Sequence, residues 1–125
     1  MAKVIHFEIP ADEPERAVAF YSQVFDWKIM ELGGPVDYWL AEAGPDSEDG
    51  INGAILKRGS WQGGGSSVVN TISVPSVDEF IERITSAGGQ VLMPKTAVPG
   101  IGYMTYANDT EGNTFGIMEL DEAAA

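Results

Sequence analysis

The sequence predicts an α+β fold built from two βαβββ modules that follow one another along the chain. One observation is a strand, helix and three-strand pattern that occurs over residues 1–58 and again over residues 68–125. The other is a Gly/Ser-rich linker, residues 59–67, between the two copies. Each four-stranded sheet needs a helix on one face, so we expect two curled sheets around a central cleft, with the helices outside.

The first strand is predicted over Lys3–Ile9. Its apolar residues, Ile5, Phe7 and Ile9, alternate with polar ones, which is typical of a strand with one buried face. Pro10 is expected to end the strand because proline has no backbone N–H to donate. By the same alternation, His6 is expected to face the cleft.

The first helix is predicted at about residues 13–25. Asp12 with Glu15 three residues later forms a capping-box pattern, and Pro14 suits the first turn. Apolar residues that recur at helical spacing should then pack on the sheet, namely Ala17, Phe20, Tyr21, Val24 and Phe25.

The second module repeats this order. A strand over Val68–Val74 is followed by a second capping pattern at Ser76 and Glu79, a helix at about residues 77–87, and Gly88-Gly89, where glycine accepts the left-handed conformation that ends a helix. Three short strands should follow each helix: Trp27–Leu32, Asp37–Glu42 and Asn52–Lys57 in the first module, then Gln90–Met93, Tyr103–Ala107 and Thr114–Leu120 in the second.

The composition narrows the class of protein. The 125 residues carry 7 Lys and Arg against 19 Asp and Glu, a formal charge of -12 that repels nucleic acid and anionic membranes alike. The absence of cysteine excludes disulfides and thiolate metal sites and fits a cytoplasmic protein. No apolar run approaches the length of a membrane span, so the expected partner is a small molecule.

Two short segments could be misread as binding loops. The glycines before Ser66 lack the Gly-Lys-Ser/Thr of a phosphate loop, and no helix begins directly after them, so a linker is the better interpretation. Asp109 to Asn113 lacks the spread of acidic ligands that calcium requires and reads as a hairpin turn.

Six local patterns lie along the chain: Val4-Ile5-His6-Phe7, Phe20-Tyr21 with Val24-Phe25-Asp26-Trp27, Val36-Asp37-Tyr38-Trp39-Leu40, Ala87-Gly88-Gly89, Pro94-Lys95-Thr96-Ala97-Val98-Pro99-Gly100 and Asp109-Thr110-Glu111-Gly112-Asn113. Together they resemble the vicinal oxygen chelate superfamily, which comprises glyoxalases, bleomycin resistance proteins and extradiol dioxygenases. The similarity is closest to a subgroup related to lactoylglutathione lyases, whose members mostly lack an assigned reaction. It implies a small oxygenated ligand, lyase, isomerase or dioxygenase chemistry, a divalent metal in the cleft, and a homodimer.

The metal that the resemblance implies lacks ligands in this sequence. His6, the chain's one histidine, matches the first ligand position, and its counterpart in the second module is Asn70 or Thr71, depending on the alignment. The position of the usual closing-strand glutamate falls on Gly116, whereas Glu119 should point to the opposite face. His6 and Glu119 are too few for a site that needs about three ligands, so we expect a metal-poor or metal-free cleft, although the resemblance implies a divalent metal, and we assign no other cofactor.

Aromatic residues supply the remaining candidates for the cleft. Adjacent residues of a strand face opposite sides, so one of Tyr38 and Trp39 should enter the cleft and the other should face the helix. Tyr103 and Tyr106 differ in the same way. The predicted ligand-binding residues are His6, Glu8, Tyr38 and Tyr103, although these aromatic rings would equally suit a core.

Two functions fit these observations, and no catalytic residue is assigned. The first is an enzyme of glyoxalase type that acts on a small oxygenated organic molecule, as the resemblance and His6 indicate. The second is a noncatalytic protein that binds a small molecule for sequestration or sensing, as the missing metal ligands indicate.

Overall fold

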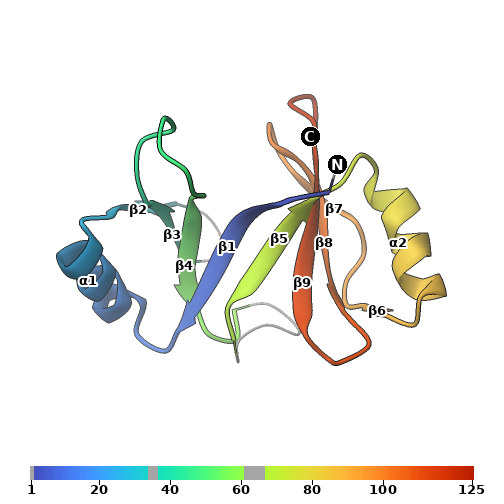
Figure 1. Cartoon of the computed structure of the whole chain (residues 1–125), viewed down its shortest axis with the longest axis horizontal. Coiled ribbons are helices and arrows are strands. Elements are labelled where there is room, and N and C mark those ends of the chain that lie inside the picture. Colours follow the sequence, from blue (N-terminus) through green and yellow to red (C-terminus); the bar gives the residue numbers. More distant parts are fainter. Residues whose placement is uncertain (1, 34–36, 61–66) are drawn as a thin grey trace. The chain divides into compact units, whose positions relative to one another are not determined.

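A computed structural model describes residues 2–33, 37–60 and 67–125 of the chain (Figure 1). Contacts between residues divide it into two compact units. The first unit is His6–Val69, and the second unit joins Asn70–Ala125 with the residues up to Ile5. Most of the predicted Gly/Ser-rich linker, residues 61–66, lies outside the described residues. Neither described helix has the length and hydropathy of a membrane span.

The first module has the predicted βαβββ order. Its strands pair in the order β2-β3-β4-β1, with β1 and β4 parallel and the other pairs antiparallel. The elements are β1 (Val4–Ala11), α1 (Pro14–Phe25), β2 (Lys28–Leu32), β3 (Tyr38–Glu42) and β4 (Gly53–Lys57).

The second module repeats this order with one further strand. β5 and β9 are parallel, β9 is antiparallel to β8, and both β6 and β7 pair with β8. The three-residue β7 was not predicted, but the α+β class and the two βαβββ modules are confirmed. The elements are β5 (Val69–Ser73), α2 (Val77–Ser86), β6 (Gln90–Val91), β7 (Thr96–Val98), β8 (Gly102–Asn108) and β9 (Thr114–Leu120).

The two helices begin differently, although their sequence patterns are alike. Ser76 caps α2 as predicted, because its Oγ accepts a hydrogen bond from the Glu79 N–H at 3.1 Å. The predicted cap at Asp12 is wrong: Glu13 occupies the N-cap position of α1 and makes no side-chain cap. The Asp12 carboxylate instead accepts a hydrogen bond from Nε of Arg58 at 2.9 Å. Asp12 therefore forms an ion pair with the residue that follows β4 and does not cap the helix.

The expected end of β1 at Pro10 is also wrong, since the strand runs on to Ala11 and Pro10 lies opposite Leu56. The carbonyl of Ala11 accepts from the Arg58 N–H, so the backbone polar groups of Ala11 point to β4. Those of the preceding residue point away from β4, and proline therefore costs the ladder no hydrogen bond.

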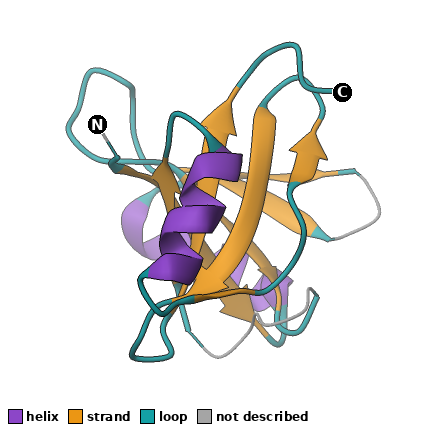
Figure 2. Ribbon diagram, turned by 90° about the vertical axis from the view of Figure 1, so that its right-hand side faces the viewer, coloured by secondary structure: helices purple, strands orange, loops and turns teal. Residues whose placement is uncertain are grey.

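Each helix covers one face of the sheet in its own unit, as Figure 2 shows for α2, the helix nearest the viewer. Trp39 and Ile55 form the core beneath α1, so Trp39 is the member of its pair that faces the helix. In the second unit Val77 and Ile117 form the core beneath α2, and the left-handed Gly88 follows the end of that helix as predicted.

The apolar stripe of α1 is only partly buried. Ala17 and Tyr21 pack on the core, whereas Phe20, Val24 and Phe25 are 55%, 53% and 55% exposed. The stripe is wider than the contact with the sheet, because residues on its flank turn away from the strands.

The close approach of β1 to β4 explains Gly53. A Cβ there would lie 2.5 Å from the Phe7 carbonyl oxygen and would also meet the Phe7 ring. We therefore expect Gly53→Ala to lower the free energy of unfolding by about 1–3 kcal/mol, as overpacking does. Denaturant unfolding measures this change. The control is Gly33→Ala, whose Cβ would meet nothing within 4 Å; an equal loss in both variants would refute the explanation.

Candidate functional site

The candidate site lies in the first unit, on the face of its sheet turned away from α1, which we call the distal face. Ile9 and Ala11 of β1 pack in the core beneath α1. Because strand side chains alternate, His6 and Glu8 lie on the distal face. Tyr38 joins them there, since its neighbour Trp39 faces the helix.

A hydrogen-bonded chain links three of the four predicted site residues. Nε2 of His6 lies 2.8 Å from the Tyr38 hydroxyl oxygen, and that hydroxyl donates to Oε2 of Glu8 at 3.4 Å. Because the hydroxyl has one hydrogen and directs it to Glu8, its oxygen accepts from Nε2–H of His6. That these three side chains bind a ligand stays a prediction.

Burial affects the protonation of these hydrogen-bonded side chains. It lowers the pKa of His6, and it raises the pKa of Tyr38, which the adjacent Glu8 carboxylate raises further. The imidazole and the phenol are therefore both uncharged at neutral pH. Glu8 itself is 5% exposed, so the series of hydrogen bonds from His6 through Tyr38 ends at a buried carboxyl group.

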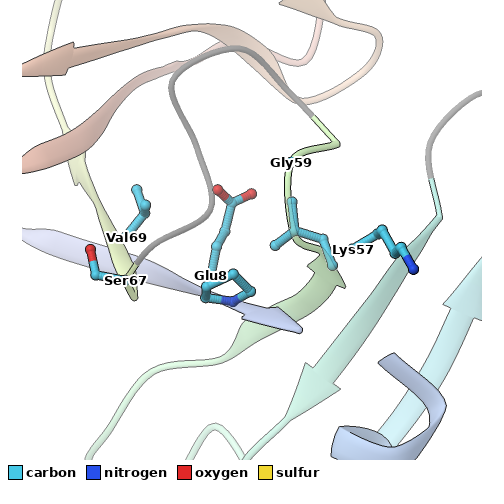
Figure 3. A pocket seen from close by; sticks show the side chains of 7 residues that line it. Glu8, Lys57, Gly59, Ser67 and Val69 are labelled. Atoms are coloured by element: carbon cyan, nitrogen blue, oxygen red, sulfur yellow. The ribbon is translucent and has the colours of Figure 1, made fainter. Parts of the chain in front are cut away.

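A small pocket adjoins Glu8 (Figure 3). Its volume of about 10 Å³ is close to that of a single water molecule. Figure 3 shows the Glu8 carboxyl group directed into the space beside Gly59, whereas the Lys57 ammonium turns away and donates to the Asp12 carbonyl at 2.8 Å. The lining residues are Glu8, Pro10, Leu56, Lys57, Gly59, Ser67 and Val69.

Apolar side chains extend the distal face beyond Tyr38. Leu32 of β2 lies directly opposite Tyr38, and Met30 lies opposite Leu40. They are 39% and 58% exposed. Neither residue was predicted as part of the site, although alternation along the predicted strand Trp27–Leu32 places both on one face.

Tyr103, the fourth predicted site residue, lies on the helix side of the sheet in the second unit. It packs against the core beneath α2, and Nζ of Lys95 lies 4.6 Å from the centre of its ring. Tyr106 is the tyrosine on the other face, and it is 7% exposed. The expected orientation of Tyr103 is therefore wrong, because the spacing alone did not show which of the two faces α2 covers.

The second module has no metal ligands at the family's positions. Thr71 lies opposite Gly116 in the ladder, and Asn70 lies opposite Phe115. Phe115 packs on the core beneath α2, so Thr71, not Asn70, shares the face of Gly116. A Cβ at Gly116 would lie 3.0 Å from Oγ1 of Thr71. A hydroxyl beside a glycine is a poor donor set for a transition metal.

Glu119, the other candidate metal ligand, binds the backbone at the start of α2 instead. Its Oε1 accepts the N–H of Val77 at 2.9 Å, so the carboxylate stabilises the start of α2, where the helix dipole favours negative charge. In the ladder it lies opposite Tyr103, on the helix side. Among the residues that the structure describes, no three His, Cys, Asp or Glu side chains gather as a metal site would require. The donor set does not fit the metal that the family implies.

The segment from Asp109 to Asn113 forms the predicted turn. Oδ1 of Asp109 accepts the N–H of Asn113 at 2.9 Å and that of Glu111 at 2.8 Å. These bonds lower the pKa of Asp109, because they favour its charged form. Its carboxylate therefore stabilises the loop between β8 and β9.

His6 predicts how stability varies with pH. Its pKa in the folded protein lies below the unfolded value of 6.5, so the unfolded chain binds more protons as the pH falls through that value. Thermal unfolding of His6→Gln and the unmodified protein should give similar Tm values at about pH 7.5, and the unmodified protein should lose more Tm by about pH 5. Parallel curves for the two proteins would show that His6 titrates normally.

Metal binding provides a second test. Titration with Ni²⁺, Zn²⁺ or Mn²⁺ should show no site that is tighter than roughly micromolar and depends on His6, because too few donors converge. His6→Ala and Glu119→Ala are the informative variants. Nanomolar affinity that both of them abolish would show that these two side chains coordinate a metal.

Comparisons with known proteins agree with this fold. The chain is 30% identical over 114 residues to a glyoxylase-like domain-containing protein of Didymella fabae, covering 88% of each. It is 24% identical to CFP32 of Mycobacterium bovis over 91% of the chain but spans only 44% of that protein's length. The structure of methylmalonyl-CoA epimerase from Mycobacterium tuberculosis is similar with a TM-score of 0.70 at 11% identity, over 94% of this chain and 87% of that one.

A sequence model of a protein family also matches most of the chain. The sequence model of the Glyoxalase/Bleomycin resistance protein/Dioxygenase superfamily matches residues 3–117, nearly the whole chain. The match includes β1 with His6 and Glu8, as well as Tyr38. The chain therefore belongs to the glyoxalase/bleomycin resistance protein/dioxygenase superfamily.

Proposed function

We propose that this protein is an enzyme that transfers a proton on a small oxygenated organic molecule. The observation that carries the proposal is the hydrogen-bonded chain from the buried Glu8 through Tyr38 to His6 on the distal face. Acid–base catalysis needs titratable groups within hydrogen-bond reach of one another and of the reacting atoms. The fold's similarity to a methylmalonyl-CoA epimerase supports the same class of reaction by analogy only.

The three side chains suit separate roles in this reaction. The Glu8 carboxylate takes a proton from a carbon next to a carbonyl, and the electron pair of that C–H bond moves to the carbonyl oxygen. The Tyr38 hydroxyl, released from Glu8, donates a hydrogen bond to the resulting oxyanion. His6 orients the hydroxyl through its Nε2. Return of the proton from Glu8 to the opposite face of that carbon, after the planar enolate has turned over, completes an epimerisation with no net change in atoms or charge.

Noncatalytic binding is the second candidate. It is favoured by the incomplete metal positions at Thr71 and Gly116, where the family's catalytic members need donors. The pocket beside Glu8, with a volume of about 10 Å³, also has little room for a substrate. The two candidates differ in whether a bound ligand exchanges its protons.

We also propose that the protein acts in the cytoplasm as a homodimer. The lack of cysteine fits a reducing compartment. The homodimer is proposed because members of the superfamily commonly form homodimers. Light scattering of the purified chain measures its mass in solution and tests the second point.

Proton exchange in D₂O tests the catalytic proposal. The protein is incubated with α-hydroxy ketones, 2-oxo acids and thioesters, and NMR follows the loss of the signal from the hydrogen next to the carbonyl. We expect exchange with at least one class of compound. Glu8→Gln should slow it by roughly 10²-fold or more and Tyr38→Phe by a smaller factor, because the second variant keeps the base.

The control for this experiment is Glu31→Gln. Glu31 is exposed on β2 and lies opposite Trp39, on the side of the sheet away from Glu8, so this variant removes the same charge without touching the site. Its exchange rate should equal that of the unmodified protein. Ligands that bind without any exchange would favour the noncatalytic candidate instead.

A further inference from the structure

We infer that the distal face selects ligands without negative charge, namely uncharged molecules or protonated amines that carry an apolar arm. This inference rests on the proposed function, because it takes the distal face as the place where the ligand binds. It concerns the chemical class of the ligand, which the family membership leaves open.

The charged groups of the distal face are the first reason for this inference. Glu8 contributes a buried carboxyl group, and the uncharged His6 and Tyr38 add no positive charge beside it. Lys28 lies on the same face two residues from Met30, but it stands directly opposite Glu42 in the ladder. Two carboxylates against one ammonium leave this face with a formal charge of -1.

Five of the other six cations of the chain have partners outside the distal face. In the first unit, Lys57 and Arg58 bond to Asp12, and Arg16 pairs with Glu13 at 2.7 Å. In the second unit, Lys95 pairs with Asp78, Arg83 lies over the Phe80 ring, and Lys3 follows the N-terminus. The residues that the structure does not describe include no Lys or Arg. The remaining cation of the first unit is Lys28 on β2, and β3 and β4 separate that strand from Glu8 on β1.

The apolar side chains that lie beside Tyr38 on the distal face are the second reason. Met30 and Leu32 are 58% and 39% exposed on the distal face, and Leu32 lies directly opposite Tyr38. A ligand with an apolar arm would cover them while its polar group reached the hydroxyl of Tyr38. Burial of that arm contributes about 25 cal/mol per Å² of apolar surface.

An anionic ligand would meet two unfavourable terms on this face. Its charge would approach the buried Glu8 carboxylate, where the low dielectric strengthens repulsion. It would also enter the field of a chain with a formal charge of -12. A coenzyme A thioester, such as the one named for the structurally similar epimerase, carries several negative charges and is therefore an unsuitable ligand here.

Three probes with a common arm test this inference: phenylacetamide, phenethylamine and phenylacetate. NMR shifts of the His6 ring report binding without ambiguity, since the chain has one histidine. We expect the amide and the amine to bind at least roughly tenfold more tightly than phenylacetate, about 1.4 kcal/mol. In Glu8→Gln the preference over phenylacetate should shrink, whereas in Glu31→Gln, which removes an equal charge from the other side of the sheet, it should persist.

Salt separates the local effect from the general one. At 1 M salt the screening length is about 3 Å, so the field of the whole chain vanishes while a carboxylate in contact with the ligand still acts. The preference should survive at this salt concentration in the unmodified protein. Equal or tighter binding of phenylacetate would overturn the inference, as would a preference that disappears in salt or falls equally in both variants.

Failure of the inference and failure of the proposed function are distinguishable. Selective binding of the amide, with no proton exchange for any compound, would leave the inference intact and refute the enzyme. Proton exchange on anionic thioesters would refute the inference and leave the enzyme intact. If none of the three probes shifts the His6 ring at any soluble concentration, the distal face is not the ligand site, and the inference is wrong.

Discussion

The two-residue alternation of strand side chains, with a helix against one face of each sheet, is the constraint on which the site depends. In β1 this alternation sends Ile9 and Ala11 beneath α1 and leaves Glu8 on the distal face. A shift of one residue in the pairing of β1 with β4 would exchange the two sets, placing the carboxyl group in the core and apolar residues on the distal face. The parallel register of Phe7 with Gly53 opposes such a shift, because only glycine tolerates the Phe7 ring there.

The polar chain on the distal face has a structural consequence of its own. A buried carboxyl group needs hydrogen-bond partners, and the Tyr38 hydroxyl is one partner of Glu8, so Tyr38 contributes to the fold as well as to any reaction. Tyr38 reaches Glu8 from β3, a strand that does not pair with β1. The hydrogen-bonded chain therefore connects strands at two places in the sheet, and its loss should affect both binding and local order.

The two modules share a plan but not its chemistry. Where the first module has His6, the second has Thr71, whose hydroxyl lies beside Gly116. The carboxylate nearest in sequence to that glycine on β9, Glu119, stabilises the first turn of α2. The repeat thus preserves the positions of helices and strands, which depend on apolar spacing, more faithfully than the polar residues, which depend on a particular ligand. The first unit alone holds an assembled acid–base chain in the described part of the protein.

Local sequence patterns were enough to predict the helices, most of the strands and the duplicated βαβββ plan, because apolar periodicity, glycine and proline act over a few residues. They also placed His6 and Glu8 on one face and separated Tyr38 from Trp39. Local patterns did not predict three features correctly: the start of α1 near Asp12, the face on which Tyr103 lies, and the choice of Thr71 over Asn70. Each of these depends on a residue distant in sequence: Arg58 draws Asp12 away from the helix, and α2 selects which face of β5 and β8 is covered. The contact between His6 and Tyr38, 32 residues apart, likewise exists only after β4 has paired with both β1 and β3, since alternation assigns a face but pairing determines which side chains meet on it.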